Sequence, residues 1–211
     1  MKRKIKAVIF DIDGSLINTE LALYYLIKDT LRRYGEKKRN KEEILEPFGS
    51  SGTTWIKKLI PGIRKERLIH MKRFVAEQYA KHYMKRFGRP MPHASYILRE
   101  LKKRNIKLAI ATNQTKKQSK VALDIINFHK FNVVAAVDLV KNPKPAPDTI
   151  FYALKKLKAK KDEVLYIGDT MTDVKAAKAA GVNLYLVEHH YNKHIKHKKI
   201  KNLKEILKLI S

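Results

Sequence analysis

The most informative stretch of the sequence is Lys6-Ala7-Val8-Ile9-Phe10-Asp11-Ile12-Asp13-Gly14. Its four consecutive apolar residues, most of them β-branched or aromatic, predict a buried strand. Ligands of open α/β sheets bind at the carboxyl ends of strands, and two neighbouring carboxylates there need a cation to offset their repulsion. The stretch therefore predicts a metal site and a candidate nucleophile, although Asp and Gly are also ordinary turn formers. A strand that continued through Asp13 would place both carboxylates on one face.

Strand patterns recur along the rest of the chain. Apolar runs occupy residues 106–111, 133–137, 164–167 and 184–187. Helical patterns lie at residues 94–103, 117–126, 148–157 and 171–180. This alternation predicts an α/β fold in which a Rossmann-like parallel sheet carries helices on both faces.

The segment from residue 18 to residue 90 contains no comparable strand pattern. Helical patterns at residues 19–34, 41–46, 53–59 and 64–87 are separated by Gly- and Pro-containing turns. An all-helical insertion at this place is suited to act as a lid or substrate-selecting domain. We therefore expect a core of residues 1–17 and 91–211 and a helical cap of residues 18–90, with Trp55 buried in a cap helix.

Composition limits the class of protein. The chain of 211 residues is 44% hydrophobic, which is typical of a globular protein, and it has no cysteine for disulfides or thiolate metal sites. No run approaches the roughly 20 apolar residues of a membrane span, and no apolar signal core precedes the first strand. We expect a cytoplasmic protein, monomeric or dimeric, with no membrane partner.

The formal net charge is +27, from 47 Lys and Arg residues against 20 Asp and Glu. Such a charge attracts anions, including phosphorylated metabolites and nucleic acid. The lysines lie on nearly every predicted helix, which favours a general lysine bias over a dedicated patch. The stretch from His189-His190 through His194 and His197 to Lys201 is predicted to be a solvated loop, with polyphosphate or RNA contact as the alternative.

Polar residues follow three further strand patterns: Thr112-Asn113, then Lys144 between two prolines, then Asp169 and Asp173 at a strand-to-helix turn. These residue types suit phosphoryl transfer. One carboxylate can attack phosphorus and a second can transfer the proton. A hydroxyl and a lysine can hold the phosphoryl oxygens, and oxygen ligands without Cys or a nearby His favour Mg²⁺ over Zn²⁺.

These four segments resemble the four motifs of the haloacid dehalogenase-like hydrolase superfamily. The matching residues are Asp11-Ile12-Asp13-Gly14-Ser15-Leu16, Thr112-Asn113, Lys144-Pro145-Ala146-Pro147-Asp148 and Gly168-Asp169-Thr170-Met171-Thr172-Asp173. The resemblance extends from about residue 5 to about residue 187, and the helical segment resembles the cap of the phosphoglycolate phosphatase and β-phosphoglucomutase branch. Ser15 replaces a frequent Thr and Asn18 a frequent Asp, and neither change affects the expected catalytic pair.

The resemblance implies a role for each matched residue. Asp11 is implied as the nucleophile and a Mg²⁺ ligand. Asp13 is implied as the general acid and base, with its backbone carbonyl also on Mg²⁺. Asp169 is implied as the third protein ligand, with Asp173 behind it or acting through water.

Phosphate binding is implied for the remaining matched residues, which are Thr112, Lys144 and the backbone amide of Asn113. The presence of Asp13, which dehalogenase-type members lack, points to a phosphate ester as substrate. We therefore expect a Mg²⁺-dependent phosphatase that acts on a small phosphorylated metabolite through an aspartyl-phosphate, as phosphoglycolate phosphatases do.

A phosphomutase of the β-phosphoglucomutase type remains an alternative. The loop at residues 48–55 brings no Lys or Arg for a second phosphate, which favours the phosphatase. A nucleic-acid-binding protein or nucleic-acid end-phosphatase is the alternative from another class.

Overall fold

The computed structural model describes residues 4–48 and 52–210. The chain divides into two compact units, Met1–Asn18 with Arg89–Ser211 and Thr19–Gly88. The first unit holds the sheet and the four motifs, and the second is helical. That the helical unit acts as a cap stays a prediction.

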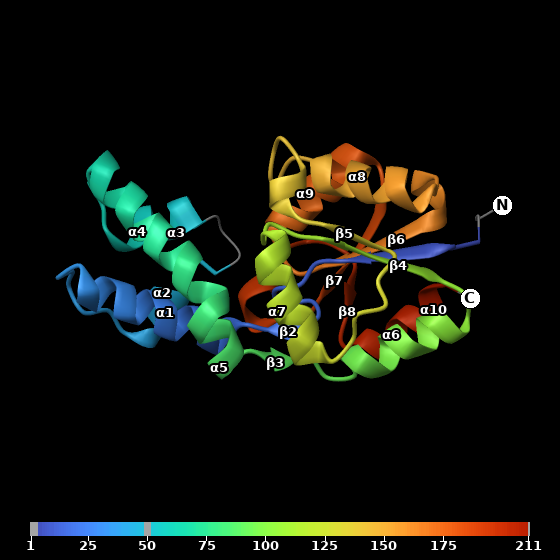
Figure 1. The fold of residues 1–211 in the computed structure, drawn as a ribbon, viewed down its shortest axis with the longest axis horizontal. Helices are drawn as coiled ribbons and strands as arrows, with labels where there is room; N and C mark the ends of the chain where they lie inside the picture. The colour runs from blue at the N-terminus through green and yellow to red at the C-terminus, as the bar shows by residue number, and fades with distance from the viewer. Residues whose placement is uncertain (1–3, 49–51, 211) are drawn as a thin grey trace. The chain divides into compact units, whose positions relative to one another are not determined.

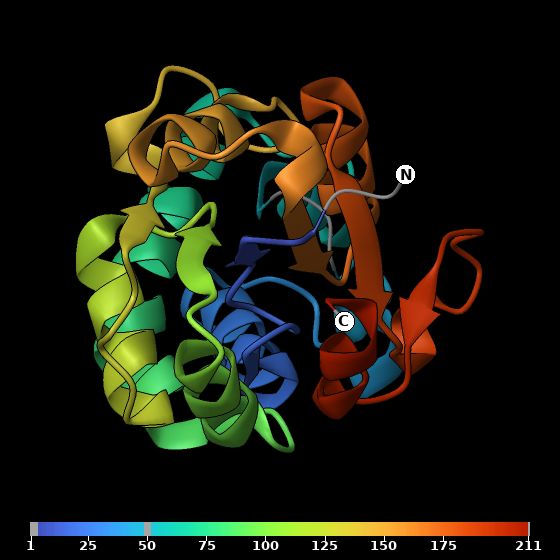
Figure 2. The ribbon, with the colours of Figure 1, turned by 90° about the vertical axis from the view of Figure 1, so that its right-hand side faces the viewer.

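The first unit is built on a six-stranded parallel sheet (Figure 1). Its strand order is β5-β4-β1-β6-β7-β8, and Figure 2 shows this order along the strands. The strands are β1 (Ala7–Phe10), β4 (Lys107–Ala111), β5 (Val133–Ala135), β6 (Val164–Gly168), β7 (Asn183–Val187) and β8 (Lys199–Ile200). The predicted α/β class with a parallel sheet is confirmed.

Helices cover both faces of this sheet. In Figures 1 and 2, α8 (Asp148–Leu157) and α9 (Met171–Ala180) lie on one face, and α6 (Ala94–Lys103) and α10 (Ile206–Leu209) lie on the other. The helix α7 (Lys116–Ile126) follows β4. Alternation along β1 explains the two layers, because successive side chains of a strand point to opposite faces. Ala7 and Ile9 belong to the buried cluster that also contains residues of α8 and α9.

The strand β1 ends at Phe10 and the chain turns, so Asp11 and Asp13 do not lie on one continuous strand. The amides of Ser15, Leu16 and Ile17 all donate to the carbonyl of Ile12, at 3.2, 2.9 and 3.0 Å. Gly14 has a φ of +73°, a conformation that L-residues with a side chain rarely adopt. Asp13 therefore lies on a tight turn, and its side-chain direction is set by that turn rather than by the pleat of β1.

Three short strands were not predicted. The strands β2 (Ile17–Asn18) and β3 (Arg89–Pro90) pair antiparallel where the chain leaves and re-enters the first unit. The strand β8 pairs parallel with β7 inside the stretch that was expected to be a solvated loop. Two-residue strands carry no readable periodicity, because alternation needs four or more residues.

The helical unit has its own apolar core. It contains α1 (Glu20–Arg33), α2 (Lys41–Leu45), α3 (Gly52–Leu59), α4 (Lys65–Gln78), a π-helix (Tyr79–Met84) and α5 (Lys85–Phe87). Trp55 is buried, as predicted, and its indole Nε1 donates to the carbonyl of Ile44 at 2.7 Å. Residues 49–51 of the predicted turn and of the loop at 48–55 lie outside the described residues. In the described part of the chain, no helix combines the length and apolar character needed to cross a bilayer.

Candidate active site

The residues predicted from the sequence meet at the carboxyl ends of the central strands of the sheet. The strands β4, β1 and β6 are adjacent and parallel, with Phe10 in register with Ile110 on one side and with Ile167 on the other. Asp11, Thr112 and Asp169 each follow one of these three strands. All three are buried, which brings two carboxyl groups and a hydroxyl into a low-dielectric environment.

Lys144 supplies the positive charge of this cluster. Its Nζ lies 2.9 Å from Asp11 Oδ1 and 2.7 Å from Asp173 Oδ1, and the side chain is 3% exposed. Lys144 comes from the loop before α8, and Asn113 holds that loop. The Asn113 side chain donates to the Lys144 carbonyl at 2.9 Å and accepts from the Lys144 amide at 2.8 Å. The structure thus gives the Asn113 side chain a positioning role beside the expected role of its backbone amide.

Asp173 is fully buried, and both of its carboxylate oxygens are engaged. Oδ1 accepts from Lys144 Nζ and, at 2.6 Å, from the hydroxyl of Tyr166. Oδ2 accepts from the amides of Asp169 and Thr170 at 3.2 and 3.0 Å, and from Thr170 Oγ1 at 2.7 Å. With these hydrogen bonds in place, Asp173 is better suited to orient its neighbours than to bind a metal directly.

Asp169 has a different environment. Its Oδ2 accepts from the hydroxyl of Tyr191 at 2.6 Å, whereas its Oδ1 is buried without a hydrogen-bond partner among the residues that the structure describes. One carboxylate oxygen from each of Asp11, Asp169 and Asp173 lies within 4.8 Å of the other two. A buried carboxylate oxygen that lacks a donor, in a cluster of oxygen ligands, fits a hard divalent cation. Asp11 and Asp169 could therefore hold a metal ion, with Asp173 next to them.

Burial and mutual repulsion shift the pKa values of these carboxyl groups. Burial raises the pKa of Asp11 to about 7, against the opposing effect of Lys144. Burial and the charges of Asp173 and Asp11 raise the pKa of Asp169 well above its usual value. Burial also acts on Asp173, but the charge and hydrogen bonds of Lys144, with those of Tyr166 and Thr170, hold its pKa below the usual value. Asp11 and Asp169 therefore bind protons more readily than ordinary carboxyl groups, because they are buried and one lysine does not offset three carboxylates.

Asp13 is connected to the end of β4 through Gln114. The Gln114 Nε2 donates to Asp13 Oδ2 at 2.8 Å, and the Gln114 amide donates to Thr112 Oγ1 at 3.2 Å. The sequence offered one signal for Gln114, its position directly after the Thr112-Asn113 pair, and we did not predict a role for it. Its side chain fixes the direction of the Asp13 carboxylate, whose charge acts on Asp11.

Comparison with known proteins identifies the family. The family model described as haloacid dehalogenase-like hydrolase matches residues 8–187. The chain belongs to the haloacid dehalogenase-like hydrolase family. The resemblance and the prediction of a hydrolytic enzyme are confirmed.

Two curated relatives match most of this chain. A protein named phosphoglycolate phosphatase from Aquifex aeolicus is 26% identical over 186 residues, which cover 86% of this chain and 84% of that protein. A protein named pyrophosphatase PpaX from Halalkalibacterium halodurans is 30% identical over 188 residues, which cover 87% and 84%. A solved structure of CbbY from Rhodobacter sphaeroides in complex with phosphate aligns with a TM-score of 0.78 at 22% identity, covering 96% of each chain. At this identity, the likeness concerns the fold alone.

The structure also brings residues from outside the four motifs to the site. Tyr166 on β6 contacts Lys144 and Asp173, with its hydroxyl 3.1 Å from Lys144 Nζ. His189 and Tyr191 come from the stretch predicted to be a solvated loop, and for these two residues that prediction is wrong. His189 Nε2 lies 2.7 Å from the Gly14 carbonyl, the Tyr191 hydroxyl donates to Asp169 Oδ2, and both residues are partly buried.

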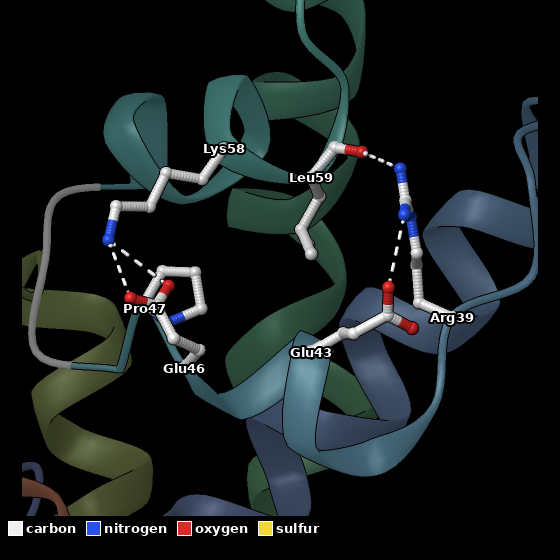
Figure 3. A pocket seen from close by; sticks show the side chains of 6 residues that line it. All are labelled: Arg39, Glu43, Glu46, Pro47, Lys58 and Leu59. Carbon is white, nitrogen blue, oxygen red and sulfur yellow. Dashed lines mark hydrogen bonds and ion pairs between the residues drawn. The ribbon is translucent and has the colours of Figure 1, made fainter.

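The helical unit carries a separate pocket of about 220 Å³ (Figure 3). Lys58 Nζ lies 2.9 Å from Glu46 Oε1, and Arg39 Nη1 lies 3.1 Å from Glu43 Oε1. Arg39 Nη2 also donates to the Leu59 carbonyl at 3.0 Å. Because both cations of the pocket have anionic partners from the same unit, we assign the chemistry to the aspartate cluster instead.

Proposed function

We propose that this chain is a Mg²⁺-dependent phosphatase that hydrolyses a small phosphorylated metabolite through an aspartyl-phosphate intermediate. The observation that carries the proposal is the buried group of Asp11, Asp169 and Asp173 around Lys144, with one oxygen of Asp169 left without a donor in the described structure. Family membership supports the same chemistry.

In the proposed first step, an Asp11 oxygen attacks phosphorus and the bond from phosphorus to the ester oxygen breaks. Asp13 gives its proton to the departing alcohol. In the second step, Asp13 takes a proton from water, whose oxygen attacks phosphorus and releases inorganic phosphate from Asp11. Lys144 and Thr112, with the Asn113 amide, hold the phosphoryl oxygens through both steps. The hydrogen bond from Gln114 keeps the Asp13 carboxyl oriented for both proton transfers.

The proposed Mg²⁺ ligands are the side chains of Asp11 and Asp169 and the backbone carbonyl of Asp13. When bound, the ion offsets the negative charge that gathers in this cluster as a phosphate enters. All three ligands are oxygen atoms, which Mg²⁺ prefers. Asp173 accepts hydrogen bonds from Lys144 and from Thr170, and it fixes these residues next to the proposed ligands.

The names of the relatives suggest two substrate candidates, phosphoglycolate and inorganic pyrophosphate. Pyrophosphate would use the same nucleophile, with phosphate instead of an alcohol as the leaving group. A mutase requires an aspartyl-phosphate that survives long enough to rephosphorylate a sugar phosphate. Nucleic-acid phosphate ends are the alternative suggested by the net charge of +27.

The decisive experiment measures phosphate release from a panel of compounds, with Mg²⁺ and with EDTA. The panel contains phosphoglycolate, pyrophosphate, a β-sugar 1-phosphate and an oligonucleotide with a terminal phosphate. We expect Mg²⁺-dependent release from a small monoester. Release from the oligonucleotide alone would favour the end-phosphatase, and conversion of the sugar phosphate to its isomer would favour the mutase. Absence of Mg²⁺-dependent turnover on every compound would reject the proposal.

A further inference from the structure

A short segment that belongs to none of the four motifs reaches the candidate metal site. It is the turn His189–Asn192 between β7 and β8, which contains a single 3-10 turn over His190–Asn192. Three of its side chains contact motif residues. His189 contacts Gly14, Tyr191 contacts Asp169, and Asn192 Nδ2 donates to the Asp169 carbonyl at 2.7 Å. We call His189–Asn192 the clamp segment.

The clamp segment is fixed by its own hydrogen bonds. Asn192 is fully buried, its Oδ1 accepts from the His189 amide at 2.9 Å, and its Nδ2 also donates to the Val187 carbonyl at 2.8 Å. The rings of His189 and Tyr191 stack, with centroids 4.7 Å apart and an interplanar angle of 9°. The Tyr191 hydroxyl is therefore presented to Asp169 by a rigid support.

The clamp segment lies in close contact with the turn at Gly14, which follows Asp11 and Asp13. A Cβ atom on Gly14 would collide with Asp169 Oδ2 and would lie 2.6 Å from the Tyr191 hydroxyl. The hydrogen bond from Tyr191 and the turn at Gly14 thus occupy the same side of the Asp169 carboxylate. With Oδ2 held there, rotation of the carboxyl group is restricted, and Oδ1 remains the oxygen without a donor among the described residues.

We propose that Tyr191 is a positioning residue that orients Asp169 for cation binding, and that His189 supports it by ring stacking and by its contact with Gly14. This inference rests on the proposed function, because it takes Asp169 as a metal ligand. Partners that hold a ligating carboxylate tune metal affinity, and their loss costs about 10- to 100-fold in affinity.

The test is Tyr191→Phe, which removes the hydroxyl and keeps the stacking ring. We expect the dissociation constant for Mg²⁺ alone, measured by isothermal titration calorimetry, to rise about tenfold or more. The Mg²⁺ concentration for half-maximal activity rises in parallel, while KM for substrate at saturating Mg²⁺ stays unchanged. The matched control is Tyr185→Phe on β7, which leaves Mg²⁺ affinity at the wild-type value.

A second variant covers the case in which Tyr191→Phe does not fold, as judged by circular dichroism in EDTA. His189→Phe keeps an aromatic ring for stacking and removes the nitrogen that contacts Gly14, and it is expected to weaken Mg²⁺ binding in the same direction. Wild-type Mg²⁺ affinity in a folded Tyr191→Phe protein would overturn the inference and leave the phosphatase proposal standing. A wild-type protein that hydrolyses phosphate esters but binds no Mg²⁺ would overturn both the proposed metal site and the positioning role of Tyr191 in the clamp segment.

Discussion

Asp11 provides the most direct test of the proposed chemistry. Asp11→Asn keeps the shape of the side chain and removes the attacking carboxylate, so turnover should fall by at least about a thousandfold. Phosphate release measures the activity and circular dichroism the fold. Asp124→Asn, an exposed matched substitution on α7, should leave the rate unchanged. Wild-type turnover in a pure Asp11→Asn preparation would exclude Asp11 as the nucleophile.

The raised pKa of Asp11 also predicts a pH-dependent difference in stability. The folded protein favours protonated Asp11. Protonation of Asp11 therefore stabilises the fold fully below pH 3.8, and this stabilisation is lost as the pH rises to about 7. Asp11→Asn has no such loss. In EDTA, the melting temperature of Asp11→Asn relative to wild type should therefore be higher at about pH 8 than at about pH 5. A difference independent of pH would contradict the shifted pKa.

Asp13 is assigned to proton transfer. The decrease in rate on removing its carboxyl group should therefore depend on the leaving group of the substrate. Asp13→Ala should slow hydrolysis of an alkyl phosphate by about 100-fold or more, because an alkoxide leaves poorly without a proton. Hydrolysis of p-nitrophenyl phosphate should be slowed much less, since that phenolate needs little protonation. Comparing kcat/KM on both substrates measures the effect, because kcat/KM reports the first step and excludes the later hydrolysis of the aspartyl-phosphate. Equal losses would argue against Asp13 as the acid.

Asp11, Asp13, Lys144 and Asp169 could be proposed as site residues from the sequence, because each follows a strand pattern of the same predicted sheet, and the family resemblance implied their separate roles. The roles of Gln114 and Tyr191 could not. Gln114 matters because the turn at Gly14 directs Asp13 toward it, and that turn is a three-dimensional feature. Tyr191 lies in a stretch rich in His and Lys, whose composition resembles a solvated surface.

Among the elements, β6 combines packing with support of the site. Tyr166, at the middle of β6, is fully buried, and its hydroxyl contacts both Lys144 and Asp173. Tyr166→Phe should lower the free energy of unfolding by about 1–3 kcal/mol, because it removes buried hydrogen bonds to charged groups. Urea denaturation measures this change. Tyr152→Phe on α8 is the control, with an expected change within about 0.5 kcal/mol. An unchanged midpoint for Tyr166→Phe would mean that these contacts add no stability.

The long helices and strands could be predicted from the sequence because their apolar spacing extends over several turns or residues. The predicted helices at 94–103, 148–157 and 171–180 match α6, α8 and α9 at both ends. The predicted helix at 64–87 is instead α4, a π-helix and α5, because a change in hydrogen-bond spacing within a helix leaves no mark in the apolar pattern.

For the molecule as a whole, the net charge of +27 predicts faster capture of anionic substrates at low salt. Raising KCl from about 10 mM to about 1 M shortens the Debye length from about 30 Å to about 3 Å. We expect kcat/KM for a phosphate monoester to fall over this range while kcat changes little. Steady-state kinetics in KCl measures both constants. A kcat/KM that does not respond to salt would show that the surface charge plays no part in substrate capture.

The two edges of the sheet are short. The strand β5 has three residues and β8 has two, with Lys198 and Lys201 on either side of β8. Another chain could form only a few backbone hydrogen bonds at such edges, and lysines beside an edge strand discourage that pairing. The sheet therefore offers little template for fibre growth, so a concentrated or heated sample should resist edge-to-edge aggregation.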